Sequence, residues 1–78
     1  MSVIVEKVCP ASYGEKAGVL AGDELVKIND HEIFDVLDYR FYLTERQVAL
    51  SLLRGGEEYS VVIKKGEYDD IGLEFETP

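Results

Sequence analysis

The stretch Ala17–Ile33 constrains the fold of this chain more than any other, because turn signals bound a short apolar alternation on both sides. Gly18 ends a short helix-like segment, and Gly22-Asp23 forms a second turn before the apolar alternation Leu25–Ile28. Asn29-Asp30 then reverses the chain, since both residue types tolerate the positive φ that a two-residue hairpin turn requires. This succession of turn, strand, tight turn and strand predicts a β-hairpin, against which we expect the remaining elements to pack.

The apolar patterning of the rest of the chain predicts a mostly β domain with two helices. The predicted strands are Val3–Val8, Leu25–Ile28, Glu32–Phe34, Val48–Leu53, Tyr59–Lys64 and Leu73–Glu76. The predicted helices are Tyr13–Ala17, capped by Ser12 together with Glu15, and Val36–Leu43, capped by Asp35. Short strands with two helices of unequal length indicate a small, partly open β-barrel.

The longer predicted helix has two partly apolar faces. Leu37 and Phe41 are four residues apart, and so are Val36 and Arg40, so each pair shares one side of the helix. We expect one face to pack on the core and the other to line a groove. Arg40 stands between aromatic residues, where it can stack and donate hydrogen bonds to a partner; the alternative is an ordinary surface pair with Asp38 or Glu45.

The charge balance and the single cysteine limit the classes of partner. Sixteen acidic residues against eight basic ones give a net charge of −8, which disfavours nucleic acid and anionic membranes and favours basic partners. Cys9 is the only cysteine, so no internal disulfide can form, and Met1–Val3 has no signal-peptide character. No apolar run has the roughly 20 residues of a membrane-spanning helix. We therefore expect a monomeric, cytoplasmic single domain over residues 1–78.

No motif in the sequence predicts catalysis or metal binding. Ser12 is expected to cap a helix, and Asp69-Asp70 is expected to be a solvated loop pair. His31 is expected at an exposed turn and Cys9 at a strand end, and one histidine with one cysteine cannot form a zinc site of the usual kind. The chain also lacks glycine-rich phosphate or dinucleotide motifs. We therefore expect that this segment alone is not an enzyme and does not bind a cofactor.

Two adjoining segments resemble a known family signature. Pro10–Val19, followed after two residues by Gly22–Asn29, resembles the PDZ domain signature: a proline-small-serine start, a short helix ending in Ala-Gly, and Gly-Asp before an apolar strand closed by Asn. The resemblance covers nearly the whole chain if the order is permuted, as in bacterial PDZ domains. The strand Tyr59–Lys64, the carboxylate-binding loop Ile71-Gly72-Leu73 and the groove strand Leu73–Phe75 then come last instead of first.

The resemblance implies a peptide groove between the last strand and the second helix, where a bound peptide adds a strand to the sheet. Its residues would be Ile71, Gly72, Leu73, Glu74 and Phe75 from the loop and strand, with Val36, Arg40 and Leu43 from the helix. Successive backbone N–H groups of the loop can hold a carboxylate, and a glycine permits close approach. The alternative interpretation is that the glycine only serves a turn and the apolar residues only serve the core.

Acidic residues surround the predicted loop and bear on the kind of ligand. Glu67, Asp69 and Asp70 precede the loop and Glu74 follows it, so an incoming carboxylate would meet like charges worth about 1 kcal/mol per close pair. Arg40 or the pair Lys64-Lys65 could offset this repulsion. Our hypothesis is that the groove binds an internal or basic segment, taken either from another protein or from the same chain.

A second resemblance suggests a parent protein. Asp35–Tyr42 and Asp69–Glu76 are similar to the N-terminal PDZ-like segment of a family of bacterial iron–sulfur oxidoreductases. In that family a radical-SAM-like domain with a cysteine cluster follows. The resemblance implies that this chain is a fragment and that redox chemistry lies beyond Pro78. Two alternatives are a structural domain whose groove is filled by its own chain, and a PDZ domain of a periplasmic protease, which the absent signal peptide disfavours.

Overall fold

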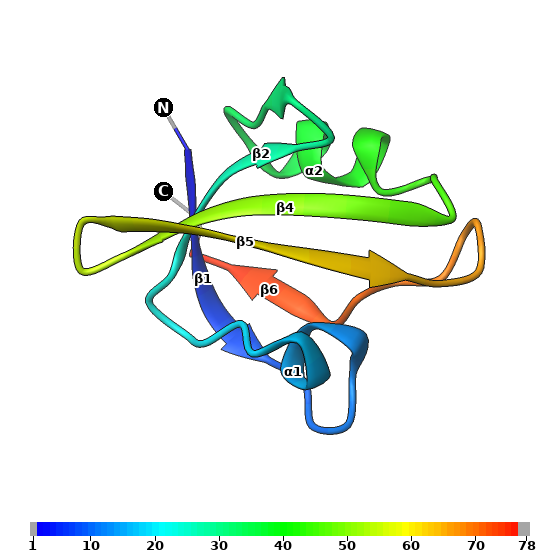
Figure 1. Cartoon of the computed structure of the whole chain (residues 1–78), viewed down its shortest axis with the longest axis horizontal. Helices are drawn as coiled ribbons and strands as arrows, with labels where there is room; N and C mark the ends of the chain where they lie inside the picture. Colours follow the sequence, from blue (N-terminus) through cyan, green and yellow to red (C-terminus); the bar gives the residue numbers. More distant parts are fainter. Residues whose placement is uncertain (1, 77–78) are drawn as a thin grey trace.

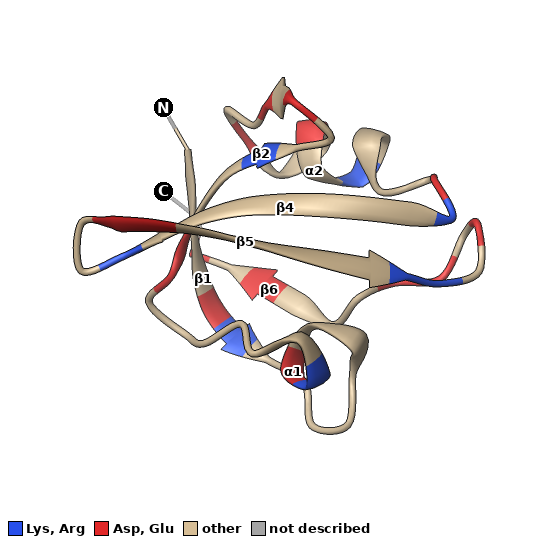
Figure 2. Ribbon diagram, viewed as in Figure 1, with Lys and Arg blue, Asp and Glu red and all other residues tan. Residues whose placement is uncertain are grey.

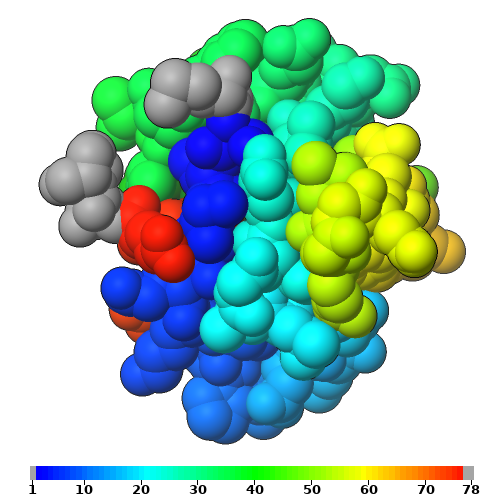
Figure 3. All heavy atoms as spheres, turned by 90° about the vertical axis from the view of Figure 1, so that its left-hand side faces the viewer, coloured from blue at the N-terminus to red at the C-terminus, as the bar shows by residue number. Residues whose placement is uncertain are grey.

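The computed structural model describes residues 2–76, which form an open antiparallel sheet with two short helices (Figure 1). The strands are β1 (Val3–Val8), β2 (Glu24–Ile28), β3 (His31–Glu32), β4 (Gln47–Arg54), β5 (Glu57–Lys64) and β6 (Leu73–Phe75), and the helices are α1 (Tyr13–Ala17) and α2 (Val36–Tyr42). The strand order is β5-β4-β2-β1-β6, with β3 paired only to β2. Figure 3 shows β6, β1, β2 and the tip of the β4–β5 hairpin side by side. The predicted mostly β fold with two helices is confirmed, and the sheet that was expected to form a partly open barrel is an open, uncurled sheet.

The hairpin predicted from Ala17–Ile33 is present, and its tight turn has the expected conformation. Asn29 and Asp30 have φ angles of 50° and 68°, so both central residues are left-handed. The Asn29 side chain also accepts a hydrogen bond from the Ala49 N–H (2.8 Å), which ties the end of β2 to β4. The returning strand is His31–Glu32 instead of the predicted Glu32–Phe34, because the chain bends toward the α2 cap directly after the buried Ile33.

Helix α1 begins and ends where the sequence predicted. The Ser12 hydroxyl accepts a hydrogen bond from the Glu15 N–H (3.2 Å), and the Glu15 carboxylate accepts one from the Ala11 N–H (2.8 Å). Gly18, with φ of 94°, ends the helix in the left-handed region. This short helix packs against β5.

Helix α2 is capped by Asp35 as predicted, but its buried face is different from the one predicted. Leu37 and Phe41 are 74% and 70% exposed, whereas Tyr39 is only 4% exposed. The Tyr39 ring lies on the opposite side of the helix from Leu37, and it packs edge-on against Phe75 with ring centroids 4.6 Å apart. The prediction that a Leu37–Phe41 face would serve the core or the groove is therefore wrong. The large tyrosine ring fills the space beneath the helix instead.

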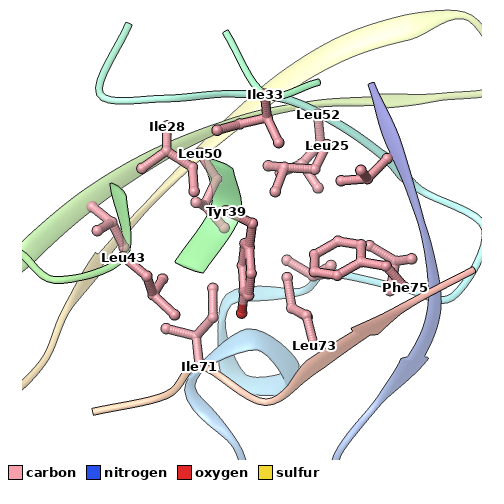
Figure 4. Packing of buried hydrophobic residues seen from close by; sticks show 14 of the residues in the cluster. Leu25, Ile28, Ile33, Tyr39, Leu43, Leu50, Leu52, Ile71, Leu73 and Phe75 are labelled. Atoms are coloured by element: carbon pink, nitrogen blue, oxygen red, sulfur yellow. The ribbon is translucent and has the colours of Figure 1, made fainter. Parts of the chain in front are cut away.

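The hydrophobic core lies between the sheet and α2. Val48, Leu50 and Leu52 are fully buried on one face of β4, as their alternation predicted. They pack with buried residues of β2, the segment after β3, α2 and the C-terminal strand (Figure 4); these are Leu25, Ile28, Ile33, Tyr39, Leu43, Ile71, Leu73 and Phe75. The C-terminal residues Ile71, Leu73 and Phe75, which the permuted PDZ order places last in the chain, therefore contribute directly to the core.

A buried carboxylate joins the turn before β2 to the β4–β5 hairpin. Asp23 is 1% exposed and accepts hydrogen bonds from the Arg54 Nε and Nη2 atoms, each at 2.8 Å, from the Tyr59 hydroxyl and from the Leu20 N–H. Arg54 also donates to the Gly18 carbonyl at 2.8 Å. The hydrogen bonds from Arg54 lower the pKa of Asp23 to about 2, and burial together with Asp23 raises the pKa of Tyr59 to about 12. The sequence indicated Asp23 only as a turn residue.

Candidate functional site

Strand β6 forms one edge of the sheet, and its backbone faces two ways. On one side it pairs with β1, where the Gly72 carbonyl accepts from the Cys9 N–H (2.8 Å) and the Glu76 N–H donates to the Ile4 carbonyl (2.9 Å). Backbone groups alternate along a strand, so those of Leu73 and Phe75 point to the opposite side. No strand pairs with that side within residues 2–76. We call these outward backbone groups of Leu73 and Phe75 the β6 edge.

A cavity of about 290 Å³ lies between α2 and the loop that leads into β6. It is lined by Tyr39, Arg40, Leu43, Thr44, Tyr68, Asp69, Asp70 and Leu73, and we call it the α2 groove. Three of the residues that the sequence proposed for a peptide site, namely Arg40, Leu43 and Leu73, line this one cavity. The helix and the loop that leads into the edge strand therefore border a common hollow, and its use as a peptide groove stays a prediction.

The other five proposed residues lie elsewhere. Ile71 is fully buried and Phe75 is 8% exposed, both within the core, and Val36 is half-buried against that core. The Glu74 side chain is exposed, and its backbone groups face β1. Gly72 lines a second hollow that faces α1. The apolar loop residues thus pack in the core, in keeping with the alternative interpretation of their pattern.

The loop at Gly72 is fastened to the start of α1. The Gly14 N–H donates to the Ile71 carbonyl at 2.8 Å, next to the Cys9–Gly72 hydrogen bond. Gly72 has a φ of 85°, and a β-carbon at this position would lie 2.3 Å from the Ser12 β-carbon. Both the left-handed backbone and the close approach therefore require glycine. This requirement agrees with the alternative interpretation of Gly72 as a turn residue, and its role in holding a carboxylate stays a prediction.

The Tyr39 hydroxyl reaches the same loop from the α2 side. Figure 4 shows the Tyr39 ring pointing between Ile71 and Leu73 with its oxygen toward the loop. This hydroxyl donates to Asp70 Oδ1 at 3.4 Å. Burial raises the pKa of Tyr39 above its usual value, the Asp70 charge raises it further, and a backbone hydrogen bond from Leu73 opposes both. Sequence reasoning gave Tyr39 no role, although a tyrosine on the buried side of a helix needs a polar partner.

The loop between β5 and β6 carries basic and acidic residues in succession (Figure 2), and Asp69 and Asp70 of this loop line the α2 groove. The Asp69 carboxylate accepts from the Gly66 N–H (3.0 Å) and the Tyr13 hydroxyl (3.2 Å), and the latter hydrogen bond raises the pKa of Tyr13. Lys65 is 8% exposed, and its Nζ atom donates to the Gly66 and Glu67 carbonyls. Lys65 is thereby committed to its own loop and is not positioned to offset the acidic groups in the groove.

Arg40 has no ion-pair partner among the described residues. Within residues 2–76 the one salt bridge joins Arg54 and Asp23, so the alternative pairing of Arg40 with Asp38 or Glu45 is not formed. The Asp38 carboxylate instead accepts from the Phe34 N–H at 3.0 Å, beside the helix cap. Arg40 is exposed and lines the α2 groove opposite the acidic loop. Its guanidinium is therefore available to a bound molecule.

An edge strand beside a helix, with a hollow between them, defines a class of small domain that can accept an added strand. The sequence model of the PDZ domain family matches residues 4–54, well over half of the chain, and the chain belongs to this family. PDZ domains are protein-interaction modules, which is the general function of this chain. No curated protein matches the chain at a significant level. The matched region ends with β4, and the structure adds β5 and β6 to the same sheet, joined by the acidic loop.

Two further observations concern residues 2–76. Neither of the helices in this part of the chain has the length and apolar character needed to cross a membrane. Over the same residues, no three side chains of the histidine, cysteine, aspartate or glutamate type gather in a way that would hold a metal ion.

Proposed function

We propose that this domain binds an extended peptide segment, which adds to the β6 edge and lies along the α2 groove. The observation that carries the proposal is that the backbone N–H and C=O groups of Leu73 and Phe75 point away from β1, and that Leu73 also lines the α2 groove. Hydrogen bonds to these groups would supply affinity that is independent of sequence, and the groove would select among side chains. A short edge provides few hydrogen bonds, so we expect modest affinity unless Arg40 and the cavity contribute.

The chemistry of the groove favours an internal, basic segment over a free C-terminus. The Tyr39 hydroxyl and the Asp70 carboxylate stand at the loop where a terminal carboxylate would sit. A second carboxylate there would meet Asp70 and Asp69, at a cost of about 1 kcal/mol per close pair. A lysine or arginine of the ligand would instead be attracted to these two carboxylates, with a gain of similar size. Arg40, on the other wall, can donate to a backbone carbonyl or an acidic side chain of the segment.

We also propose that the domain works within a larger iron–sulfur protein of the bacterial radical-SAM-like type. The support is the similarity of Asp35–Tyr42 and Asp69–Glu76 to the N-terminal segment of that family. These two segments form α2 with its cap and the loop with β6, so they are the walls of the α2 groove. In such a parent the groove would bind either a partner protein or a neighbouring segment of the same chain. The coding sequence beyond residue 78 tests this proposal directly.

A titration of the ¹⁵N-labelled domain followed by NMR tests the peptide proposal. The ligands are a mixed peptide pool with free C-termini and the same pool with amidated C-termini. We expect shifts at Ile71–Glu76 and Val36–Leu43 with both pools, because the ligand is recognised along its length. Shifts with the free-carboxylate pool alone would show a reader of C-termini. No shifts with either pool would favour a structural domain whose groove is closed or reserved for its own chain.

The Asp70→Asn variant provides a matched prediction for the same titration. Removing this charge is expected to strengthen binding of the free-carboxylate pool about fivefold, corresponding to the loss of one close repulsion of about 1 kcal/mol. Binding of basic amidated peptides should weaken by a similar factor. The substitution keeps the size of the side chain, and Asp70 contacts only the Tyr39 hydroxyl among the hydrogen bonds described for it. Equal responses of both pools would contradict the proposed role of Asp70.

A further inference from the structure

The outer side of α2 presents a line of exposed apolar side chains. Phe34, Leu37 and Phe41 are 54%, 74% and 70% exposed. Leu37 and Phe41 are four residues apart in α2 and share one side of the helix, and Phe34 directly precedes the Asp35 cap. Single exposed apolar residues are common, but three large ones within eight residues of the chain, all more than half exposed, indicate an interaction surface. We call Phe34, Leu37 and Phe41 the α2 ridge.

The ridge stands between two hollows. One flank of α2 borders the α2 groove through Arg40 and Thr44. The other flank borders a separate hollow of about 520 Å³, lined by Asn29, His31, Phe41, Tyr42, Thr44 and Glu45. The His31 ring stacks on the Tyr42 ring at 4.2 Å with 7° between the planes, so this second hollow has a flat aromatic wall. A partner can therefore surround the ridge from both sides.

We propose that the α2 ridge is a second docking site, for a protein partner whose contact surface is apolar in the centre and basic at the rim. The residues next to the ridge along the chain are mainly acidic: Glu32, Asp35, Asp38 and Glu45, against Arg40. Lysine and arginine side chains around an apolar centre would complement this pattern. Leu37 lies on the opposite side of α2 from Tyr39, which packs against Phe75 of β6, so this inference does not depend on the proposed peptide groove.

Two other occupants of the ridge are less consistent with its size and charge. A helix of seven residues is about 10 Å long, and three side chains cover much less than the roughly 800 Å² per partner of a stable dimer interface. Two copies would also bring their acidic rims together, each on a chain of net charge −8. An anionic lipid surface would be repelled by the same rim. A heterologous protein with a basic rim avoids both costs.

Two designed helical peptides test the proposal with the complete 78-residue chain. Both carry the same leucine face, one with a lysine rim and the other with a glutamate rim. In NMR titrations we expect shifts at residues 34–45 with the lysine-rimmed peptide, and at least about tenfold weaker binding of the glutamate-rimmed peptide. The Leu37→Ser/Phe41→Ser variant should lose at least about tenfold in affinity for the lysine-rimmed peptide, because exposed apolar anchors carry most of the binding energy.

The Leu20→Ser/Val62→Ser variant is the matched control, since it removes two apolar side chains that are 54% and 57% exposed elsewhere on the surface. It should bind the lysine-rimmed peptide as tightly as the unmodified chain does. Both variants should keep the dispersed amide chemical shifts of the folded, unmodified chain. Equal binding of the two peptides, shifts at the β6 edge instead of the ridge, or undiminished binding by the ridge variant would overturn the proposal. The proposal would also be overturned if the unmodified chain formed a dimer in analytical ultracentrifugation, or bound anionic vesicles, and the ridge variant lost that association.

Discussion

The Gly72→Ala variant is expected to lose about 3 kcal/mol of unfolding free energy, a large part of the roughly 4–12 kcal/mol available to a domain of this size. Two costs add at this residue. The φ of 85° is unfavourable for any residue with a β-carbon, and that carbon would lie 2.3 Å from the Ser12 β-carbon and 2.6 Å from its hydroxyl oxygen. Urea denaturation followed by circular dichroism measures the loss.

The Gly22→Ala variant separates the two costs. Gly22 has a φ of 94°, but an added β-carbon would meet no atom within 4 Å. Only the backbone term remains, so we expect a loss of about 1–2 kcal/mol. If both variants lost the same amount, the contact between the loop and the start of α1 would not restrict the size of the residue at Gly72.

The Asp23→Ala variant is expected to lose about 2–3 kcal/mol of unfolding free energy at neutral pH. It removes the acceptor of hydrogen bonds from Arg54, Tyr59 and the Leu20 N–H, and it leaves the last of these without its partner. Glu58→Ala is the control, because it removes one acidic charge from an exposed position in β5 and should change stability by less than about 0.5 kcal/mol. An equally small effect at Asp23 would mean that its network contributes little.

The contribution of Asp23 should also depend on pH. Its pKa is lowered from 3.8 to about 2 in the folded domain, so the folded state favours the ionised form. Stability from this group is therefore fully present above about pH 4 and is lost as the pH falls toward 2. The stability difference between the unmodified chain and Asp23→Ala should shrink across this interval. A difference that stayed constant from pH 7 to pH 2 would rule out ionisation as its source.

Local patterns in the sequence were sufficient to predict the hairpin at Asn29-Asp30, both helix caps and the buried face of β4. Each of these depends on neighbours within a few residues, where turn chemistry and alternation act directly. The buried face of α2 was mispredicted, because Leu37–Phe41 and Tyr39 offer competing apolar sides. The choice between them depends on the space beside Phe75, which lies at the far end of the chain.

Contacts between distant residues account for what the sequence could not predict about the site. Asp23 and Arg54 are 31 positions apart, and no local pattern indicates that they pair. The α2 groove brings Arg40, Leu43 and Leu73 together, while Ile71 and Phe75 turn into the core. Alternation along β6 correctly grouped Leu73 with Phe75, but their backbone direction follows from pairing with β1. A resemblance to PDZ domains could propose the groove, and the packing decides which residues line it.

The central claim is that a peptide segment adds to the β6 edge, and the backbone amides of β6 test it most directly. Amide hydrogen exchange at Leu73, Glu74, Phe75 and Glu76 would be measured by NMR with and without the amidated peptide pool. The account predicts that Phe75 becomes protected and that Leu73 gains protection, while Glu74 and Glu76, which already face β1, change little. Binding that shifts resonances but leaves Leu73 and Phe75 exchanging as before would contradict strand addition.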